Sequence, residues 1–210
     1  SDTYYDTKVV IATTKADKIT KYSQLKGKTV GVKNGTAAQR FLDKNKDKYG
    51  YKIKTFDTGD LMYNSLSAGA VDAVMDDQPV IQYAIQKGQD LAINMDGEAV
   101  GGFAFGVKKG GNHEKLITEF NKALAQMKAD GTLDEIIKKW TGESQSTANS
   151  AVPTTTTPAG QKATPKKSKY SISSDSSFAP FVFQNGKNKY TGIDMDLICL
   201  LYTSPSPRDR

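Results

Sequence analysis

Two stretches, GKTVGVKNGT at residues 27–36 and GAVDAVMDD at residues 69–77, decide the fold of this 210-residue chain. Each contains a short run of apolar and β-branched residues that leads directly into polar residues, which is typical of a buried strand that ends in a loop. Such strands alternate with helical patterns, and this alternation predicts an α/β fold with a mostly parallel sheet. Because ligands bind beyond the carboxyl ends of strands in open α/β sheets, the polar residues after these two strands are the first candidates for a binding site.

The first loop suits an anion, and the second suits a cation. Lys33 follows the first strand, and a helix is expected to begin near Thr36 and Ala37, where backbone N–H groups and the helix dipole favour a carboxylate. Asp76 and Asp77 end the second strand, and their carboxylates suit an ammonium group. A site for an anion beside a site for a cation describes a free amino acid.

Each of these residues also has a structural explanation, and the sequence leaves both open. Thr36 could be only a helix cap, and Lys33 could be an ordinary surface lysine. Asp77 also fits a helix N-cap before Pro79. Asp76 faces the opposite side of the strand from Asp77, and we expect it to be a hinge or rim residue.

The periodicity of apolar residues predicts the elements along the chain. We expect strands at 9–14, 30–33, 53–56, 71–75, 91–94, 101–107 and 170–174, and helices at 20–25, 36–45, 60–68, 79–87, 112–129, 133–140 and from 192. The strand at 101–107 is expected to leave the first sheet. A hairpin-type turn is expected at 185–188.

Composition argues against several classes of function. Basic residues outnumber acidic ones by 29 to 23, but they are spread over helices that also carry acids, so we expect no nucleic-acid partner. No apolar run approaches the ~20 residues of a membrane helix. The single histidine, His113, and the single cysteine, Cys199, form no metal-ligand spacing and no Ser/His/Asp arrangement. We therefore expect no metal, no cofactor and no enzymatic activity.

Three segments at family-like spacing carry a resemblance. SDTYY at 1–5, LKGKTVGV at 25–32 with Thr36, and ADGTLDEIIKKW at 129–140 resemble the amino-acid-binding proteins of ABC importers, of the polar amino acid and glutamine group. The resemblance implies a type II periplasmic-binding-protein-like fold, with a complete second lobe at about 12–94 and a return to the first lobe at about 101–143. It also implies that Asp77 binds the α-ammonium, that Thr36 and the backbone of Ala37 bind the α-carboxylate, and that Lys33 reaches the ligand side chain.

The C-terminal part resembles the beginning of a second receptor of the same kind. In residues 169–198, the resemblance implies that Asp175 holds the polar tip of the ligand and that Phe178 stacks on it, whereas Phe181 and Phe183 are expected in the core. Residues 144–168 are rich in Ser, Thr and Pro and are expected to be a disordered linker. Residues 199–210 resemble a translated sequencing adapter and are expected to be a non-native tail, the alternative being an ordinary disordered tail.

This order implies part of a tandem receptor fused to a permease, as in glutamine/asparagine importers of Gram-positive bacteria. We expect a monomeric domain on the extracellular face of the membrane that binds glutamine or asparagine and delivers it to an ABC permease. The alternatives are the sensing domain of a signalling receptor and a cleft enzyme, which would need an acid–base group such as Glu98. We further expect residues 169–198 to fold back onto 101–140, with 170–174 paired beside 101–107.

Overall fold

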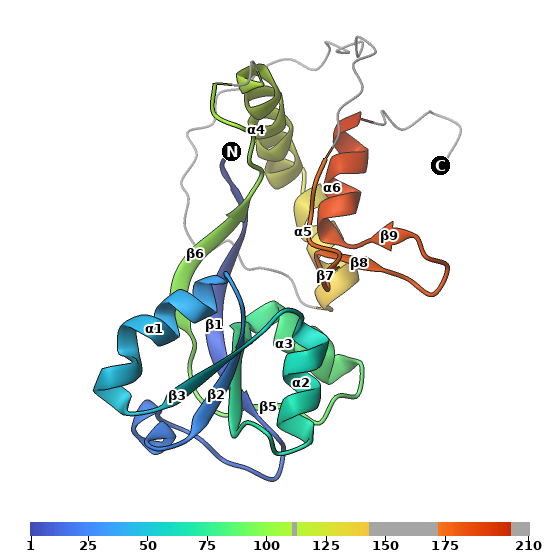
Figure 1. Ribbon diagram of the computed structural model, residues 1–210. Coiled ribbons are helices and arrows are strands. Elements are labelled where there is room, and N and C mark those ends of the chain that lie inside the picture. Colours follow the sequence, from blue (N-terminus) through green and yellow to red (C-terminus); the bar gives the residue numbers. More distant parts are fainter. Residues whose placement is uncertain (111–112, 143–171, 203–210) are drawn as a thin grey trace.

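The computed structural model describes residues 1–110, 113–142 and 172–202, and Figure 1 shows a lower lobe joined to an upper part by two long strands. The predicted linker at 144–168 and residues 203–210 of the predicted tail lie outside the described residues. Helix α6 (Ile193–Tyr202) continues past the predicted tail boundary at Ile198.

A mixed sheet forms the centre of the lower lobe. Its strands are β1 (Thr3–Thr13), β2 (Thr29–Lys33), β3 (Lys52–Phe56), β4 (Ala73–Asp77), β5 (Ala92–Ile93) and β6 (Glu98–Ala104). The order is β3-β2-β4-β1-β5, and β6 also pairs with β1. Strand β2 is parallel to β3 and β4, whereas β1 is antiparallel to β4, β5 and β6. The predicted α/β fold with a mostly parallel sheet is confirmed, with β1 as the reversed strand.

Strand β1 is longer than the sequence pattern predicts. It begins at Thr3 because its first half pairs with β6, from Thr3 opposite Ala104 to Val9 opposite Glu98. This half contains polar residues, so an apolar run alone does not indicate that it is part of the strand. Strands β1 and β6 together connect the lower lobe to the upper part (Figure 1).

Helices cover both faces of the sheet. Helix α1 (Ala37–Tyr49) packs with the short 3-10 helix at Tyr22–Leu25 on one face, and α2 (Gly59–Ser67) and α3 (Gln78–Gln86) cover the other. Alternation along the strands supplies both cores, because successive side chains point to opposite faces. The first core includes Val9, Val30, Val32, Leu42 and Met75, and the second includes Val10, Met62, Tyr63, Val74 and Ile81.

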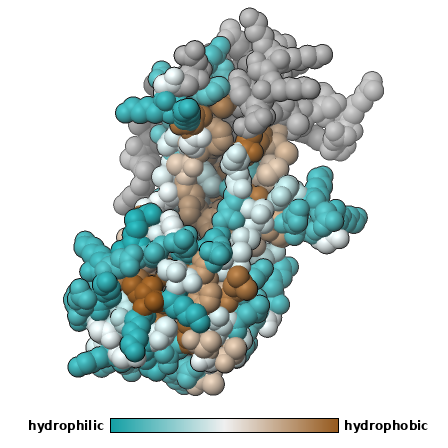
Figure 2. Space-filling model, in the orientation of Figure 1, coloured by the Kyte–Doolittle hydropathy of each residue, from teal (hydrophilic) through white to brown (hydrophobic). Residues whose placement is uncertain are grey.

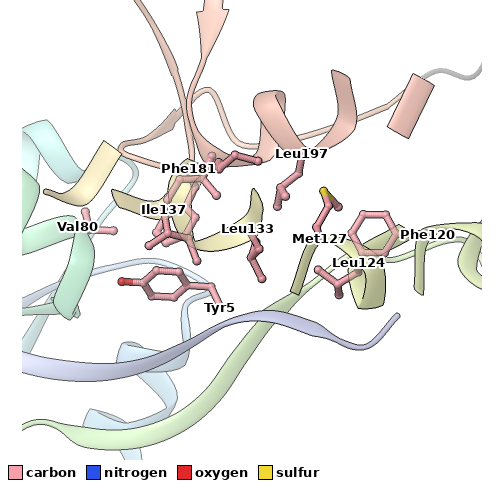
Figure 3. Close-up of a cluster of buried hydrophobic side chains, with 11 residues drawn as sticks. Tyr5, Val80, Phe120, Leu124, Met127, Leu133, Ile137, Phe181 and Leu197 are labelled. Carbon is pink, nitrogen blue, oxygen red and sulfur yellow. The ribbon is translucent and has the colours of Figure 1, made fainter. Parts of the chain in front are cut away.

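The upper part is built from segments that are far apart in the sequence. Helices α4 (Glu114–Ala129) and α5 (Thr132–Thr141) pack with α6 and with the sheet β7 (Ser177–Phe178), β8 (Val182–Gln184) and β9 (Tyr190–Thr191). Figure 3 shows Phe181 and Leu197 from the C-terminal segment pointing toward α5. Their shared core contains Tyr5, Val80, Phe120, Leu124, Met127, Leu133, Ile136, Ile137, Phe181, Ile193 and Leu197.

Polar contacts fix helix α6 on this core. The hydroxyl of Tyr4 donates to Asp194 at 2.7 Å. Asp196 accepts a hydrogen bond from the Trp140 indole at 2.7 Å and another from the Lys139 ammonium at 2.7 Å. The expected return of the C-terminal segment onto 101–140 is therefore confirmed.

The prediction of a strand at 170–174 is wrong for residues 172–174, the part of it that the structure describes, because these residues are not in a strand. Their predicted neighbour, β6, already pairs with β1 through the register that ends at Ala104. The C-terminal segment forms its own sheet of β7, β8 and β9, and residues 172–174 join neither sheet of the described chain.

The surface of the lower lobe is largely hydrophilic on the face that Figure 2 presents. Among the described helices, none combines the length and the apolar character that a membrane span requires.

Candidate ligand site at the edge of the sheet

The predicted loops meet at one edge of the sheet. Strands β2 and β4 are parallel neighbours with Val32 opposite Met75, so Lys33 and the acids of β4 end side by side. Helices α1 and α3 begin at the same edge. The structure therefore brings together the anion loop and the cation loop that the sequence places at separate positions.

Helix α1 offers backbone donors at this edge. Thr36 is its N-cap: the threonine hydroxyl accepts a hydrogen bond from the Gln39 N–H at 3.2 Å and donates to the Lys33 carbonyl at 2.8 Å. The N–H groups of Ala37 and Ala38 belong to the first turn, where no acceptor exists within a helix. Thr36 is thus a structural cap, and an anion at this position would contact the backbone at Ala37 and Ala38.

Asp77 is buried and has few partners. The residue is 6% exposed. The Thr7 hydroxyl lies 3.2 Å from the Asp77 carboxylate, but it also lies 3.3 Å from the Lys8 carbonyl. Asp77 occupies the N-cap position of α3, as predicted, yet its side chain makes no capping hydrogen bond. Burial and the neighbouring Asp76 carboxylate raise the pKa of Asp77 to about 7, although the Thr7 hydroxyl lowers it.

Asp76 is not a rim residue, because only 4% of it is exposed. Strand alternation turns its side chain toward α2, where the Tyr63 hydroxyl donates to it at 2.8 Å. Asp76 also accepts the backbone N–H of Asp77 at 2.9 Å. Burial raises the pKa of Asp76, while these hydrogen bonds and the charge of Lys33 act in the opposite direction.

Lys33 and Asp175 form an ion pair between the lower lobe and the C-terminal segment. The Lys33 side chain is 13% exposed, whereas that of Asp175 is 46% exposed. Asp175 also accepts hydrogen bonds from the Ser177 N–H at 2.9 Å and the Ser177 hydroxyl at 3.0 Å. Partial burial acts to raise the pKa of Asp175, but the bonds from Lys33 and Ser177 outweigh it, so this pKa lies below its ordinary value.

The three phenylalanines of the C-terminal segment lie in and around the upper core. Phe178 is half-buried and packs on Phe103 and Phe181, with ring centroids 5.4 and 5.1 Å away. Phe181 is fully buried, as predicted. Phe183 is half-buried, and its ring meets that of Trp140 edge-on at 5.7 Å. The stacking of Phe178 on a ligand stays a prediction.

Two contacts of the acid pair were missed from the sequence, those of Thr7 and Tyr63. Thr7 lies two residues before Val9, so the two side chains share a face of β1. Had the strand expected from residue 9 been extended to residue 7, Thr7 would have been placed on the face of Asp77. Tyr63 lies in a helix whose rotation relative to β4 could not be read from the sequence.

His113 is exposed at the N-cap of α4, and its side chain makes no capping bond. Within the described ranges, no group of three or more His, Cys, Asp or Glu side chains could hold a metal ion.

A family profile described as "Bacterial extracellular solute-binding proteins, family 3" matches residues 1–143. The L-cystine-binding protein TcyJ of Escherichia coli K12 is 34% identical over 118 residues, which cover 56% of this chain and 43% of TcyJ. The chain spans about half the length of the curated relatives it matches, from 43% to 56%.

Two solved structures have higher identity to this chain. The second substrate-binding domain of a putative amino acid ABC transporter from Streptococcus pneumoniae is 51% identical, with a TM-score of 0.54, over 67% of this chain and 64% of that one. Substrate-binding domain 2 of Lactococcus lactis GlnP, in an open conformation, is 42% identical, with a TM-score of 0.53, over 69% of this chain and 62% of that one.

Proposed function

Because the chain belongs to family 3 of the bacterial extracellular solute-binding proteins, we propose that it carries the amino-acid site of a receptor for an ABC importer. The observation that supports this most is the edge where Lys33, the start of α1 and Asp77 lie together. The α-carboxylate would bind the backbone N–H groups of Ala37 and Ala38 beside the Thr36 cap, and the α-ammonium would bind Asp77. The relatives reported above are binding proteins or substrate-binding domains, which favours a receptor over an enzyme.

A neutral polar amino acid fits best, with glutamine and asparagine as the first candidates. The Lys33–Asp175 pair offers a donor and an acceptor in one place, and a side-chain amide needs both. Asp175 is already neutralised by Lys33, so it is poorly suited to a ligand with a basic side chain. Phe178 would provide an apolar wall beside the ligand. The relative named for L-cystine has a different ligand, so the choice of amino acid rests on this pair.

Binding from two sides would let the ligand hold the lower lobe and the C-terminal segment together. Asp77 and α1 belong to the former, and Asp175 belongs to the latter. A ligand that contacts both favours the closed arrangement, and such closure is a hinge motion. We propose that the closed form delivers the amino acid to a permease at the extracellular face of the membrane, as a monomer.

Titration of the ¹⁵N-labelled chain with glutamine, asparagine, arginine and cystine tests the proposal. We expect glutamine or asparagine to shift the amide signals of residues 33–38 and Asp77, with lower affinity than a full receptor because the chain spans 64% of a related domain. Asp77→Ala should weaken binding at least roughly tenfold, since a hydrogen bond to a charged group contributes about 1.5–3 kcal/mol.

Asp72→Ala is the matched control, because Asp72 precedes β4 and its side chain is 43% exposed beside Lys28. It should leave affinity unchanged. Equal affinity in Asp77→Ala and the unchanged chain, or signals that respond to arginine alone, would contradict the proposal.

A further inference from the structure

Asp76 and Asp77 are consecutive carboxyls on one buried strand, but their partners are unequal. Asp76 accepts hydrogen bonds from the Tyr63 hydroxyl at 2.8 Å and the Asp77 N–H at 2.9 Å. The carboxyl of Asp77 has the Thr7 hydroxyl at 3.2 Å, which it shares with the Lys8 carbonyl. Because hydrogen bonds to a carboxylate stabilise its charge, the negative charge of the pair belongs on Asp76.

The surrounding charges leave the two carboxyls unequal. The charge of Lys33 on β2 lowers the pKa of Asp76, while Asp175, to which Lys33 is bound, raises it. Glu98 on β6 is in register with Asp77 through Val9, about two strand spacings or ~10 Å away. The start of α3 favours an anion at Asp77, yet the side chain makes no hydrogen bond to it.

We propose that burial, together with the charge of Asp76, keeps Asp77 protonated in the empty site, and that the α-ammonium of the incoming amino acid takes the place of this proton. The O–H bond of Asp77 breaks, the proton leaves to solvent, and the carboxylate that remains pairs with the ammonium. Amino-acid affinity therefore rises with pH through the neutral range. This inference rests on the proposed function, since it needs an ammonium at Asp77.

The expected change in affinity with pH follows from the fraction of Asp77 that is ionised. Burial beside Asp76 raises the pKa of Asp77 to about 7, so affinity for glutamine should be about tenfold higher at pH 8 than at pH 6. Close to one proton should be released per ligand bound at pH 6. Asp76 acts here as a positioning residue, because it sets the charge of Asp77 without contacting the ligand.

The decisive variant is Asp76→Asn, which removes the charge and keeps an oxygen for the Asp77 N–H, while its NH2 group can donate to the Tyr63 hydroxyl. Its matched control is Asp47→Asn, which changes an exposed acid near the far end of α1. Glutamine titrations at pH 6 and pH 8, in two buffers of different ionisation enthalpy, measure affinity and proton release together. Asp76→Asn should strengthen binding at pH 6 and reduce the pH ratio, and the pH dependence that remains reports the burial of Asp77. A merely structural role would instead weaken binding at both pH values.

A second readout needs no ligand. The carboxyl ¹³C shift of Asp77 should titrate near pH 7 in the unchanged chain and in Asp47→Asn, and at lower pH in Asp76→Asn. Tyr63→Phe should also lower this midpoint, because it removes a hydrogen bond that holds the charge on Asp76. The Tyr63→Phe variant replaces Asp76→Asn in this test if Asp76→Asn does not fold.

The outcomes separate the two proposals. If glutamine binds but Asp77 titrates in the ordinary carboxyl range, the receptor function stands and proton-coupled binding is wrong. If Asp76→Asn leaves the midpoint of Asp77 unchanged, burial alone sets that midpoint and the role proposed for Asp76 is wrong. If Asp77 titrates near pH 7 but no amino acid binds at either pH, the receptor function is wrong and the coupling falls with it.

Discussion

The carboxyl of Asp77 has an ordinary pKa of 3.8, and burial beside Asp76 raises this pKa to about 7 in the folded chain. Between these values the folded state holds a proton that the unfolded state has released. The free energy of unfolding therefore decreases as pH rises from about 4 to about 7, and this contribution is lost above the folded pKa. The residue that suits an ammonium ligand therefore destabilises the ligand-free folded state at neutral pH.

Asp77→Asn should remove this pH dependence, because the amide cannot ionise. Relative to the unchanged chain, the variant should gain stability between pH 4.5 and pH 8, on the order of a few kcal/mol. Urea unfolding at the two pH values measures the difference, with Asp47→Asn as a control on an exposed acid. An equal stability difference between Asp77→Asn and the unchanged chain at both pH values would show that Asp77 is ionised in both.

At the residue scale, position along a strand could be predicted and side-chain partners could not. The rule that polar residues gather at strand ends placed Lys33 and Asp77 together correctly. The burial of Asp76 and its bond to Tyr63 depend on how α2 is rotated against β4. The pairing of Lys33 with Asp175 depends on a return of the chain over a large sequence separation.

At the element scale, the periodicity of apolar residues predicted the strands of the lower lobe, because each of these strands pairs with a neighbour inside the same lobe. The strand expected at 170–174 shows the limit, since its described residues join neither sheet. Helix α6 also packs closely against backbone at its start. Gly192 has a φ of +127°, and a Cβ there would lie 2.1 Å from the Phe181 carbonyl oxygen.

Gly192→Ala should therefore detach α6 from the upper core while the lower lobe stays folded. Trp140 is the only tryptophan, and its indole donates to Asp196, so its emission should shift to the red when α6 leaves. Gly186→Ala is the matched control, because a Cβ at that turn would meet nothing within 4 Å. Unchanged Trp140 emission in Gly192→Ala would mean that the backbone adjusts and α6 stays in place.

At the scale of the whole molecule, the upper part has a core that no single stretch of the chain can fill. Helices α4 and α5 contribute Leu124 and Ile137, and the C-terminal segment contributes Phe181, Ile193 and Leu197, each at most 2% exposed. Full burial of such side chains stabilises by about 1.5–3 kcal/mol each. The lower lobe has two cores of its own on the two faces of its sheet. The two parts should therefore differ in how much they depend on the C-terminal segment.

A chain that ends at Gly142 tests this dependence. Without Phe181, Ile193 and Leu197, helices α4 and α5 lose the partners that cover their apolar stripe, and their amides should exchange with solvent much faster. The amides of β2, β3 and β4 should keep their protection, because both of their cores remain. Hydrogen exchange followed by mass spectrometry resolves the two regions, and a chain that ends at Tyr202 controls for shortening alone. Equal protection of α4 and α5 in both chains would show that these helices are stable without the segment, and that its return adds contacts to a part that is already folded.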